Sequence, residues 1–149
     1  MTVFFQFIAL IFLSPFSRYS EKLVMALPIV RVEHSSGAFL ELVTFGAHIL
    51  SFSTSSGQPV LFLSSKAALD GSKAIRGGLP IAFPQFAAQG PLPMHGFART
   101  STWTLDEIGN GTAQLSLVDN DGTRALWPHA FKLTLCIEFN DEHLSTTLQ

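Results

Sequence analysis

The sequence predicts an all-β protein built as an antiparallel β-sandwich. Three observations support this class: several short segments carry strand patterns, turn-forming residues separate them, and no segment carries a capped amphipathic helix of useful length. At 149 residues the chain is long enough for one domain with one buried core. We divide it into an apolar N-terminal extension, residues 1–25, and a β-sandwich domain, residues 26–149.

Residues 3–16, VFFQFIALIFLSPF, are almost entirely apolar. This segment is short for a membrane span. It is similar to the apolar core of a signal peptide, but it lacks a preceding basic side chain and a small-residue cleavage site. Two interpretations stay open: a working signal or anchor, or an extension outside a domain that begins at Met25.

The strands are expected in order along the domain. Turn chemistry separates some of them, with SSG at 55–57, NG at 110–111 and DNDG at 119–122. The expected strands with mixed patterning are 39–45, 47–54, 59–64, 101–108 and 113–119.

Residues 131–139, FKLTLCIEF, show the cleanest strand pattern in the chain. Polar or small side chains alternate there with five apolar ones, which are Phe131, Leu133, Leu135, Ile137 and Phe139. Side chains of a strand point to opposite faces in turn, so this period of two predicts that the apolar residues share one buried face.

The longest segment without strand or helix periodicity is residues 75–99, IRGGLPIAFPQFAAQGPLPMHGFAR. It holds too much apolar surface to remain disordered, and its four prolines restrict the chain. We therefore expect a stiff loop over the sheet. It presents Arg76, Gln85, Gln89, His95 and Arg99.

The two arginines leave two interpretations open. A guanidinium is permanently charged and offers a planar set of donors that suits phosphate or carboxylate, and neighbouring aromatic walls suit a sugar ring. Alternatively, Arg76 and Arg99 only tie the loop to carbonyls or surface carboxylates. The glycine pair is not a dinucleotide or phosphate-loop fingerprint, because no strand-to-helix context surrounds it.

The composition of the chain limits the classes of molecule that it is expected to bind. Charged residues make up 13% of the chain and the formal net charge is −2, which argues against nucleic acid and an anionic membrane and favours a small molecule. The single cysteine, Cys136, cannot form an internal disulfide, and no Cys/His spacing typical of zinc accompanies it. No metal site is therefore expected.

Several motifs in the same order resemble the glucose-6-phosphate 1-epimerase (hexose-6-phosphate mutarotase) family of the galactose mutarotase-like superfamily. The motifs are IRGGLPIAFPQF, HGFAR with Trp103, VLFLSSKAALDGSKAIRGG and WPHAFKLTLCIEF. The resemblance covers residues 27–149. It implies a large antiparallel sandwich, here incomplete, and cofactor-free interconversion of the α and β anomers of glucose 6-phosphate. It also implies a cytoplasmic setting. The apolar residues 3–16 leave secretion or membrane anchoring as the alternative.

The same resemblance assigns substrate-binding residues. Arg76 of IRGG and Arg99 of HGFAR match arginines that contact the phosphorylated substrate, and His95 matches a pocket residue. Family members commonly carry a substrate-binding glutamine where this chain has Met94. A thioether cannot replace the donors and acceptor of an amide, so one sugar contact is lost unless Gln85 or Gln89 supplies it.

Catalysis in this family needs a histidine and a glutamate, and the resemblance places both beyond Gln149. His143 comes too early and lies in a turn-like NDEH sequence. We expect His34, His48 and His129 to be strand or surface residues. The leading hypothesis is an epimerase-like chain that lacks its acid/base pair. The alternatives are a non-catalytic sugar-phosphate-binding module and a secreted lectin-like sandwich.

Overall fold

The structure is a computed structural model that describes residues 26–149. The predictions for residues 3–16 and for Met25 therefore lie outside the described residues. Between residues 26 and 149, no helix is both long enough and apolar enough to cross a membrane.

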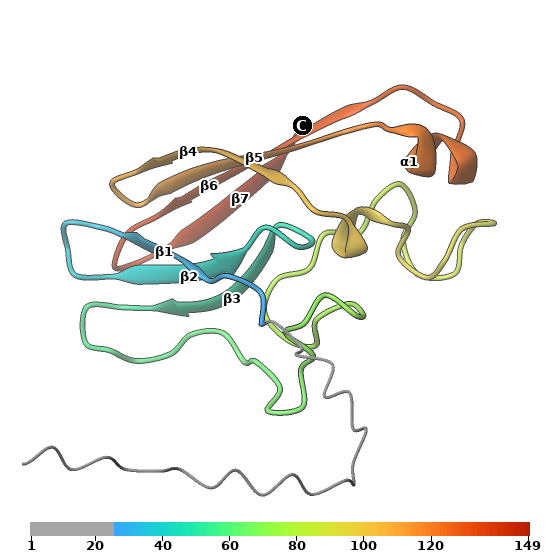
Figure 1. The fold of residues 1–149 in the computed structure, drawn as a ribbon. Helices are drawn as coiled ribbons and strands as arrows, with labels where there is room; N and C mark the ends of the chain where they lie inside the picture. The colour runs from blue at the N-terminus through green and yellow to red at the C-terminus, as the bar shows by residue number, and fades with distance from the viewer. Residues whose placement is uncertain (1–25) are drawn as a thin grey trace, which may run out of the picture.

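The described chain folds into two antiparallel sheets that lie as two layers (Figure 1). The first sheet has the order β1-β2-β3, with strands Val30–Glu33, Phe39–Val43 and His48–Ser53. The second has the order β4-β5-β6-β7, with strands Thr104–Gly109, Thr112–Val118, Lys132–Phe139 and Leu144–Leu148. The helices are a 3-10 turn, η1 (Ala98–Thr100), and α1 (Asp121–Leu126). The predicted antiparallel all-β class is confirmed.

The alternating pattern of 131–139 is confirmed in β6. Leu133, Leu135, Ile137 and Phe139 are buried in the core between the sheets, while Phe131 is half-buried just before the strand. Phe139 meets Phe52 of β3 edge to face, with ring centroids 5.6 Å apart. Burying an aromatic or aliphatic side chain of this size contributes about 1.5–3 kcal/mol, so this layer of apolar contacts holds the two sheets together.

One predicted strand is absent, and two observed strands were not predicted. Residues 59–64 form no strand, only single bridges such as Leu63 to Gly77, and Pro59 has no N–H to donate to a ladder. The short strand β1 and the polar strand β7 were not expected: the alternation of VRVE in β1 covers only four residues, and LSTTL in β7 does not alternate. The DNDG sequence does separate two strands, β5 and β6, and there Asn120 caps α1: its side chain accepts a hydrogen bond from the Thr123 N–H.

Loops at one end of the molecule join the two sheets. The N–H of Gly111, in the β4–β5 hairpin, donates to the Glu33 carbonyl over 2.8 Å. The N–H of Ser35 donates to the Asn110 side chain over 2.7 Å, and the Ser55 hydroxyl donates to Asp141 over 2.8 Å. These bonds stabilise the stacking of sheets whose strands are not hydrogen-bonded to each other.

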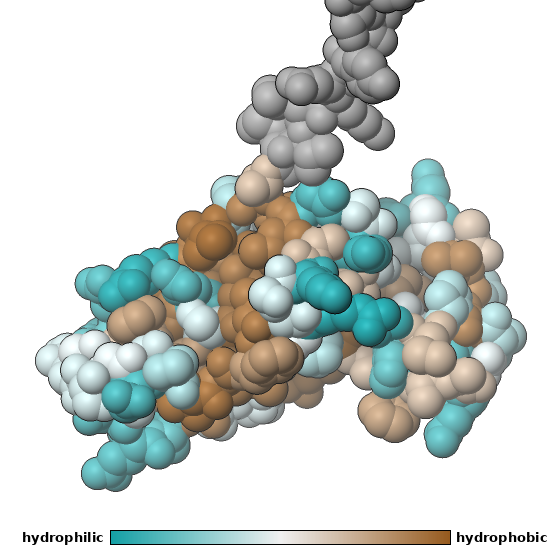
Figure 2. All heavy atoms as spheres, turned by 90° about the horizontal axis from the view of Figure 1, so that it is seen from below, coloured by the Kyte–Doolittle hydropathy of each residue, from teal (hydrophilic) through white to brown (hydrophobic). Residues whose placement is uncertain are grey.

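Residues 58–75 run across the outer side of the first sheet, below β3 in Figure 1. Their half-buried Leu63, Ala67 and Leu69 pack on a second apolar cluster of Val43, Phe45, Leu50 and Ile75. The cover is partial, since Val60 and Phe62 stay exposed. Figure 2 shows this face as an apolar band between two polar regions.

Candidate functional site

The loop of residues 75–99 lies at the opposite end from the linking hairpins and reaches η1 without a regular strand (Figure 1). Backbone hydrogen bonds attach it to the rest of the fold. Gly78 N–H donates to the Phe62 carbonyl over 2.8 Å, and Leu79 N–H donates to the Ile49 carbonyl over 3.0 Å. The loop is therefore a built element of the domain.

The glycine pair lets the start of the loop pass close to neighbouring backbone. Both residues have positive φ, +96° at Gly77 and +61° at Gly78. A Cβ at Gly77 would lie 2.5 Å from the Phe62 carbonyl oxygen, and one at Gly78 would lie 2.1 Å from that of Ile49. Only glycine allows this approach without displacing the backbone.

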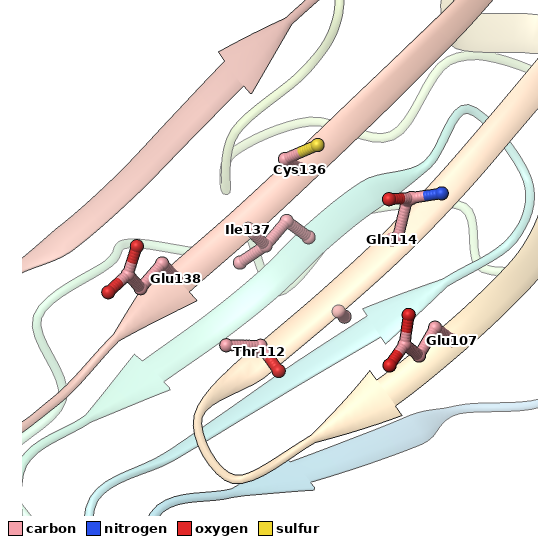
Figure 3. Close-up of a pocket in the computed structure, with 7 residues that line it drawn as sticks. Glu107, Thr112, Gln114, Cys136, Ile137 and Glu138 are labelled. Carbon is pink, nitrogen blue, oxygen red and sulfur yellow. The ribbon is translucent and has the colours of Figure 1, made fainter.

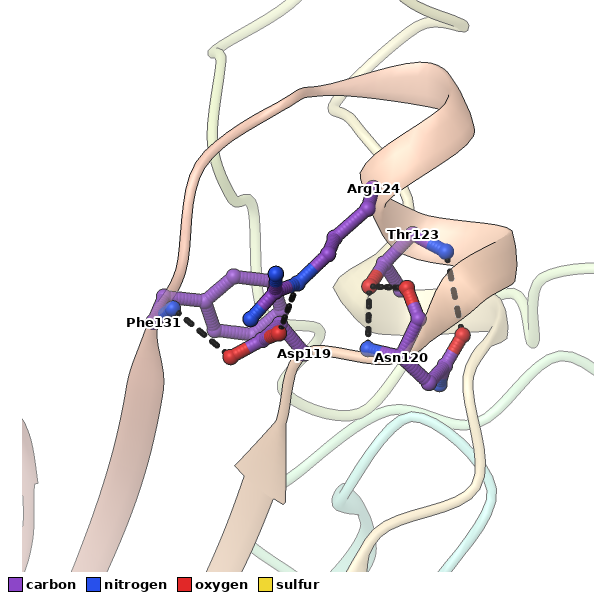
Figure 4. A network of polar contacts seen from close by, with 5 residues as sticks. All are labelled: Asp119, Asn120, Thr123, Arg124 and Phe131. Atoms are coloured by element: carbon purple, nitrogen blue, oxygen red, sulfur yellow. Dashed lines mark hydrogen bonds and ion pairs between the residues drawn. The ribbon is translucent and has the colours of Figure 1, made fainter.

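Aromatic packing supports the middle of the loop. The Phe83 ring lies 5.4 Å from both Trp127 and Phe131 and 6.1 Å from Phe97, between ring centroids. Figure 4 shows how the segment behind it is held: Asp119 accepts the Phe131 N–H over 3.1 Å and pairs with Arg124. The β5–β6 connection is thus a rigid base for the loop.

Arg76 and Arg99 line one cavity of about 520 Å³. Its other lining residues are Lys73, Ala74, Ile75, Met94 and Thr100. Three cationic side chains and no carboxylate therefore surround the cavity, and neither arginine forms an ion pair with any residue of 26–149. Such an arrangement favours a small anion with several oxygens.

Arg99 also has a structural role. Its Nη2 donates to the Met94 carbonyl over 2.6 Å, as expected if Arg99 attaches the loop to a backbone carbonyl. A guanidinium has five N–H donors, so this bond leaves others for a ligand. Arg76 is exposed, and none of its side-chain atoms is hydrogen-bonded within the described residues.

His95 lies beside this cavity and faces a smaller one of about 50 Å³, which Arg99, Pro80, Ile81 and Ala82 also line. Its backbone has a positive φ of 66°, uncommon for a residue with a side chain. The His95 Nδ1 accepts the Ala87 N–H over 3.2 Å, so the proton of the neutral ring is on Nε2. His95 can therefore donate a hydrogen bond toward the small cavity.

The expected replacement for the missing glutamine is not available at Gln85. Its amide donates to the carbonyls of Ala87 and Leu92, and its oxygen accepts the Leu92 N–H over 3.0 Å. Gln85 thus holds the loop itself. Gln89 is exposed and does not line the cavity, whereas Met94 does.

The remaining histidines divide between core and surface. His129 and His143 are exposed, and His34 is half-buried. His48 lies in β3, as a strand residue, but it is only 1% exposed, and its Nε2 lies 2.8 Å from the Gly77 carbonyl. Burial lowers the pKa of His48, and the hydrogen bond to Gly77 opposes this shift. Almost all of β3 is buried, so its sequence pattern could not show this contact.

Another cavity, of about 220 Å³, lies on the four-stranded sheet (Figure 3). Two carboxylates, Glu107 and Glu138, line it with Gln114 and Cys136. Negative charge there disfavours a phosphate, so we place the candidate site at the arginine cavity. Over residues 26–149, no group of three or more His, Cys, Asp or Glu is placed to hold a metal ion.

Comparison with known proteins identifies relatives of one kind. The family model described as aldose 1-epimerase matches residues 28–149. A protein of Escherichia coli K12, assigned by inference as a glucose-6-phosphate 1-epimerase, is 43% identical over 94 residues, which is 59% of this chain and 32% of the relative. The chain thus spans about a third of the length of the curated relatives it matches.

Solved structures share the fold. A Salmonella typhimurium protein, assigned by inference as a mutarotase, is 32% identical with a TM-score of 0.69, over 77% of this chain and 41% of that one. A galactose mutarotase-like protein of Lactobacillus casei is 19% identical with a TM-score of 0.65, over 81% of this chain and 43% of that one. The second likeness shows the fold alone. Together they confirm the predicted galactose mutarotase-like sandwich, of which this chain covers less than half.

Proposed function

The chain belongs to the aldose 1-epimerase family, and from this membership we propose that it forms the phosphate-binding part of a glucose-6-phosphate 1-epimerase. The substrate would be a hexose 6-phosphate, and the reaction would interconvert its α and β anomers. The cellular setting that we propose is the cytoplasm. The sugar is the only partner that the proposal requires.

One observation carries the proposal: Arg76 and Arg99 come from opposite ends of the loop and line the same cavity, with Lys73 beside them. Hydrogen bonds from charged donors to phosphate are among the strong polar contacts in proteins. Two arginines at one cavity therefore favour a phosphorylated sugar over the free sugar. His95 and Arg99 at the adjoining small cavity would contact the sugar end.

Anomer exchange requires more than binding. A base must take the proton of the anomeric hydroxyl, and an acid must protonate the ring oxygen, so that the ring opens, rotates and closes again. The large cavity is lined by cations, a thioether, apolar groups and a hydroxyl, which supply no carboxylate base. We propose that this chain orients the phosphate and that the acid/base pair comes from sequence outside it.

Binding selectivity tests the proposal. We expect the 149-residue chain to bind glucose 6-phosphate more tightly than glucose, because the free sugar offers the arginines no charge. Arg76→Ala should weaken the binding of glucose 6-phosphate by about 1.5–3 kcal/mol, or roughly 10- to 150-fold, and leave the binding of glucose nearly unchanged. Arg99→Ala should weaken glucose 6-phosphate at least as much, and because Arg99 also lines the small cavity it should weaken glucose as well. Isothermal titration calorimetry or NMR titration measures both affinities.

Arg31→Ala is the matched control. Arg31 carries the same charge, but it pairs with Glu33 and Glu41 on the first sheet and does not line the cavity. Its loss should leave both affinities unchanged. Equal affinity of the parent chain for the two sugars would refute the phosphate site.

A non-catalytic sugar-phosphate-binding module is the second candidate. It is favoured by the absence of a paired acid and base at the arginine cavity within residues 26–149. Both candidates predict phosphate binding, and only the epimerase requires completion by further residues that restore exchange.

A further inference from the structure

The carbonyl groups of Arg76 and Gly77 both accept hydrogen bonds from other parts of the fold. The Arg76 carbonyl accepts the Ser64 N–H over 3.1 Å. The Gly77 carbonyl accepts from the ring of His48, with Nε2 and oxygen 2.8 Å apart. The preceding Ile75 is anchored in the apolar cluster of Val43, Phe45 and Leu50. The arginine side chain is thus exposed on a backbone that is fixed before and after it.

Among these anchors, His48 is the only side chain that holds the backbone through a hydrogen bond. A carbonyl oxygen can only accept, so Nε2 must carry a proton. The ring is 1% exposed at the start of β3, and the backbone of Gly78 lies directly against it: a Cβ there would be 2.8 Å from Nε2. A planar donor fits this gap between the strand and the turn.

We propose that His48 is a positioning residue for anion binding. Its imidazole N–H fixes the turn at Gly77, so that Arg76 is presented to the cavity before the ligand arrives. A preorganised arginine loses less conformational freedom on binding, and so binds more tightly, than one on a mobile turn. This inference rests on the proposed function, since it takes the ligand to be a phosphate group.

The test compares two substitutions in the 149-residue chain. His48→Met fills a similar volume without a donor, and His48→Gln retains an N–H near the position of Nε2. We expect His48→Met to weaken the binding of inorganic phosphate by about tenfold, the scale of one hydrogen bond, and His48→Gln to restore it to within about threefold. NMR titration with inorganic phosphate measures the affinities.

A control variant in the other sheet distinguishes a specific effect on the Gly77 turn from a general loss of stability. Ile137→Val removes one methylene from the buried face of β6, away from the turn. It should lower the thermal midpoint without changing phosphate affinity. Amide hydrogen exchange at Gly78 and Leu79, whose N–H groups donate to Phe62 and Ile49, should speed up in His48→Met and not in Ile137→Val.

Each outcome supports or overturns one of the two proposals. Weaker phosphate binding and faster exchange in His48→Met, with rescue by His48→Gln, support the positioning role. Unchanged phosphate binding in His48→Met overturns it while the phosphate site stands. If the parent chain binds no phosphate, the proposed function fails; the exchange rates then show whether His48 still holds the turn or has no role there.

Discussion

At the scale of single residues, Met94 is where the resemblance leads us to expect a different side chain. Its side chain is 58% exposed and lines the arginine cavity, while its carbonyl accepts from Arg99. The resemblance places a substrate-binding glutamine at this position. Because Gln85 is bonded within the loop, no neighbouring amide supplies the missing contact.

Met94→Gln should therefore improve binding of the sugar phosphate. The change leaves the backbone bond to Arg99 in place and adds an amide at the cavity. We expect glucose 6-phosphate to bind about 2- to 10-fold more tightly, the scale of one neutral hydrogen bond, by calorimetry. Met94→Leu, which adds no polar group, is the control. A gain of the same size in Met94→Leu would show that the amide makes no contact.

Asp141 links the two sheets through one carboxylate. It accepts hydrogen bonds from the N–H and the hydroxyl of Ser55, and these bonds lower the pKa of Asp141. The folded state therefore binds the proton less readily than the unfolded state. The stabilisation is present above the unfolded pKa of about 4 and is lost as the pH falls through the folded value.

Asp141→Asn should reduce the pH dependence of stability between about pH 5 and pH 2, because it removes this carboxyl from the titration. Urea unfolding at a series of pH values measures the free energy of unfolding. Glu142→Gln removes an exposed neighbouring carboxylate and is the control. The role of Asp141 is contradicted if the parent and Asp141→Asn lose stability in parallel.

At the scale of elements, α1 shows how a short helix supports the loop from behind. Asn120 and Thr123 form a reciprocal capping box, in which each side chain accepts from the backbone N–H of the other residue (Figure 4). The helix leads through Trp127 to Phe131, and both rings pack on Phe83 of the loop. A helix of 6 residues is marginal without its cap.

Asn120→Ala should lower the free energy of unfolding by about 1 kcal/mol, because it leaves the Thr123 N–H without its acceptor. Asn120→Asp keeps an acceptor at the helix start and should be close to the parent chain. Chemical denaturation followed by tryptophan fluorescence measures the stability, and Trp103 and Trp127 both contribute to the signal. Equal destabilisation in the two variants would rule out capping as the cause.

At the scale of the whole molecule, the chain covers 41% of a related solved structure, and the proposed role of its arginine cavity is to bind the phosphate end of a substrate. Binding a phosphate stabilises ground and transition states nearly alike, and such uniform binding does not raise turnover. General acid and base groups each contribute about 10² to 10⁴ in rate. Within residues 26–149, no such pair faces the arginine cavity.

The 149-residue chain should therefore not accelerate exchange between the anomers of glucose 6-phosphate above the rate in buffer. Exchange NMR measures this rate directly at equilibrium. His95→Ala is the informative variant, since the His95 imidazole lines the small cavity that Arg99 also lines. Fast exchange that disappears in His95→Ala would make His95 a catalytic residue and would refute the assignment of catalysis to sequence outside this chain.

The sequence by itself determined the fold class and the candidate loop. Alternation in 131–139 is a local property, and it placed Leu133, Leu135, Ile137 and Phe139 on one buried face correctly. The motifs of residues 75–99, through their resemblance to a known family, predict Arg76 and Arg99 as substrate-binding residues, and this role stays a prediction. Strands β1 and β7 were not predicted: the alternation of β1 spans only four residues, β7 has none, and both strands depend on pairing with a neighbouring strand.

Only the tertiary structure decided which of these groups lie together. It brought Arg76 and Arg99 to one cavity, turned Gln85 into the loop and placed the His48 ring against Gly77. Each of these contacts joins segments that are separate in the chain, and it depends on how β3, the loop and η1 pack. Residue type specifies what a side chain can donate or accept, but packing selects its partner. The arrangement of the candidate site therefore could not be predicted from the sequence alone.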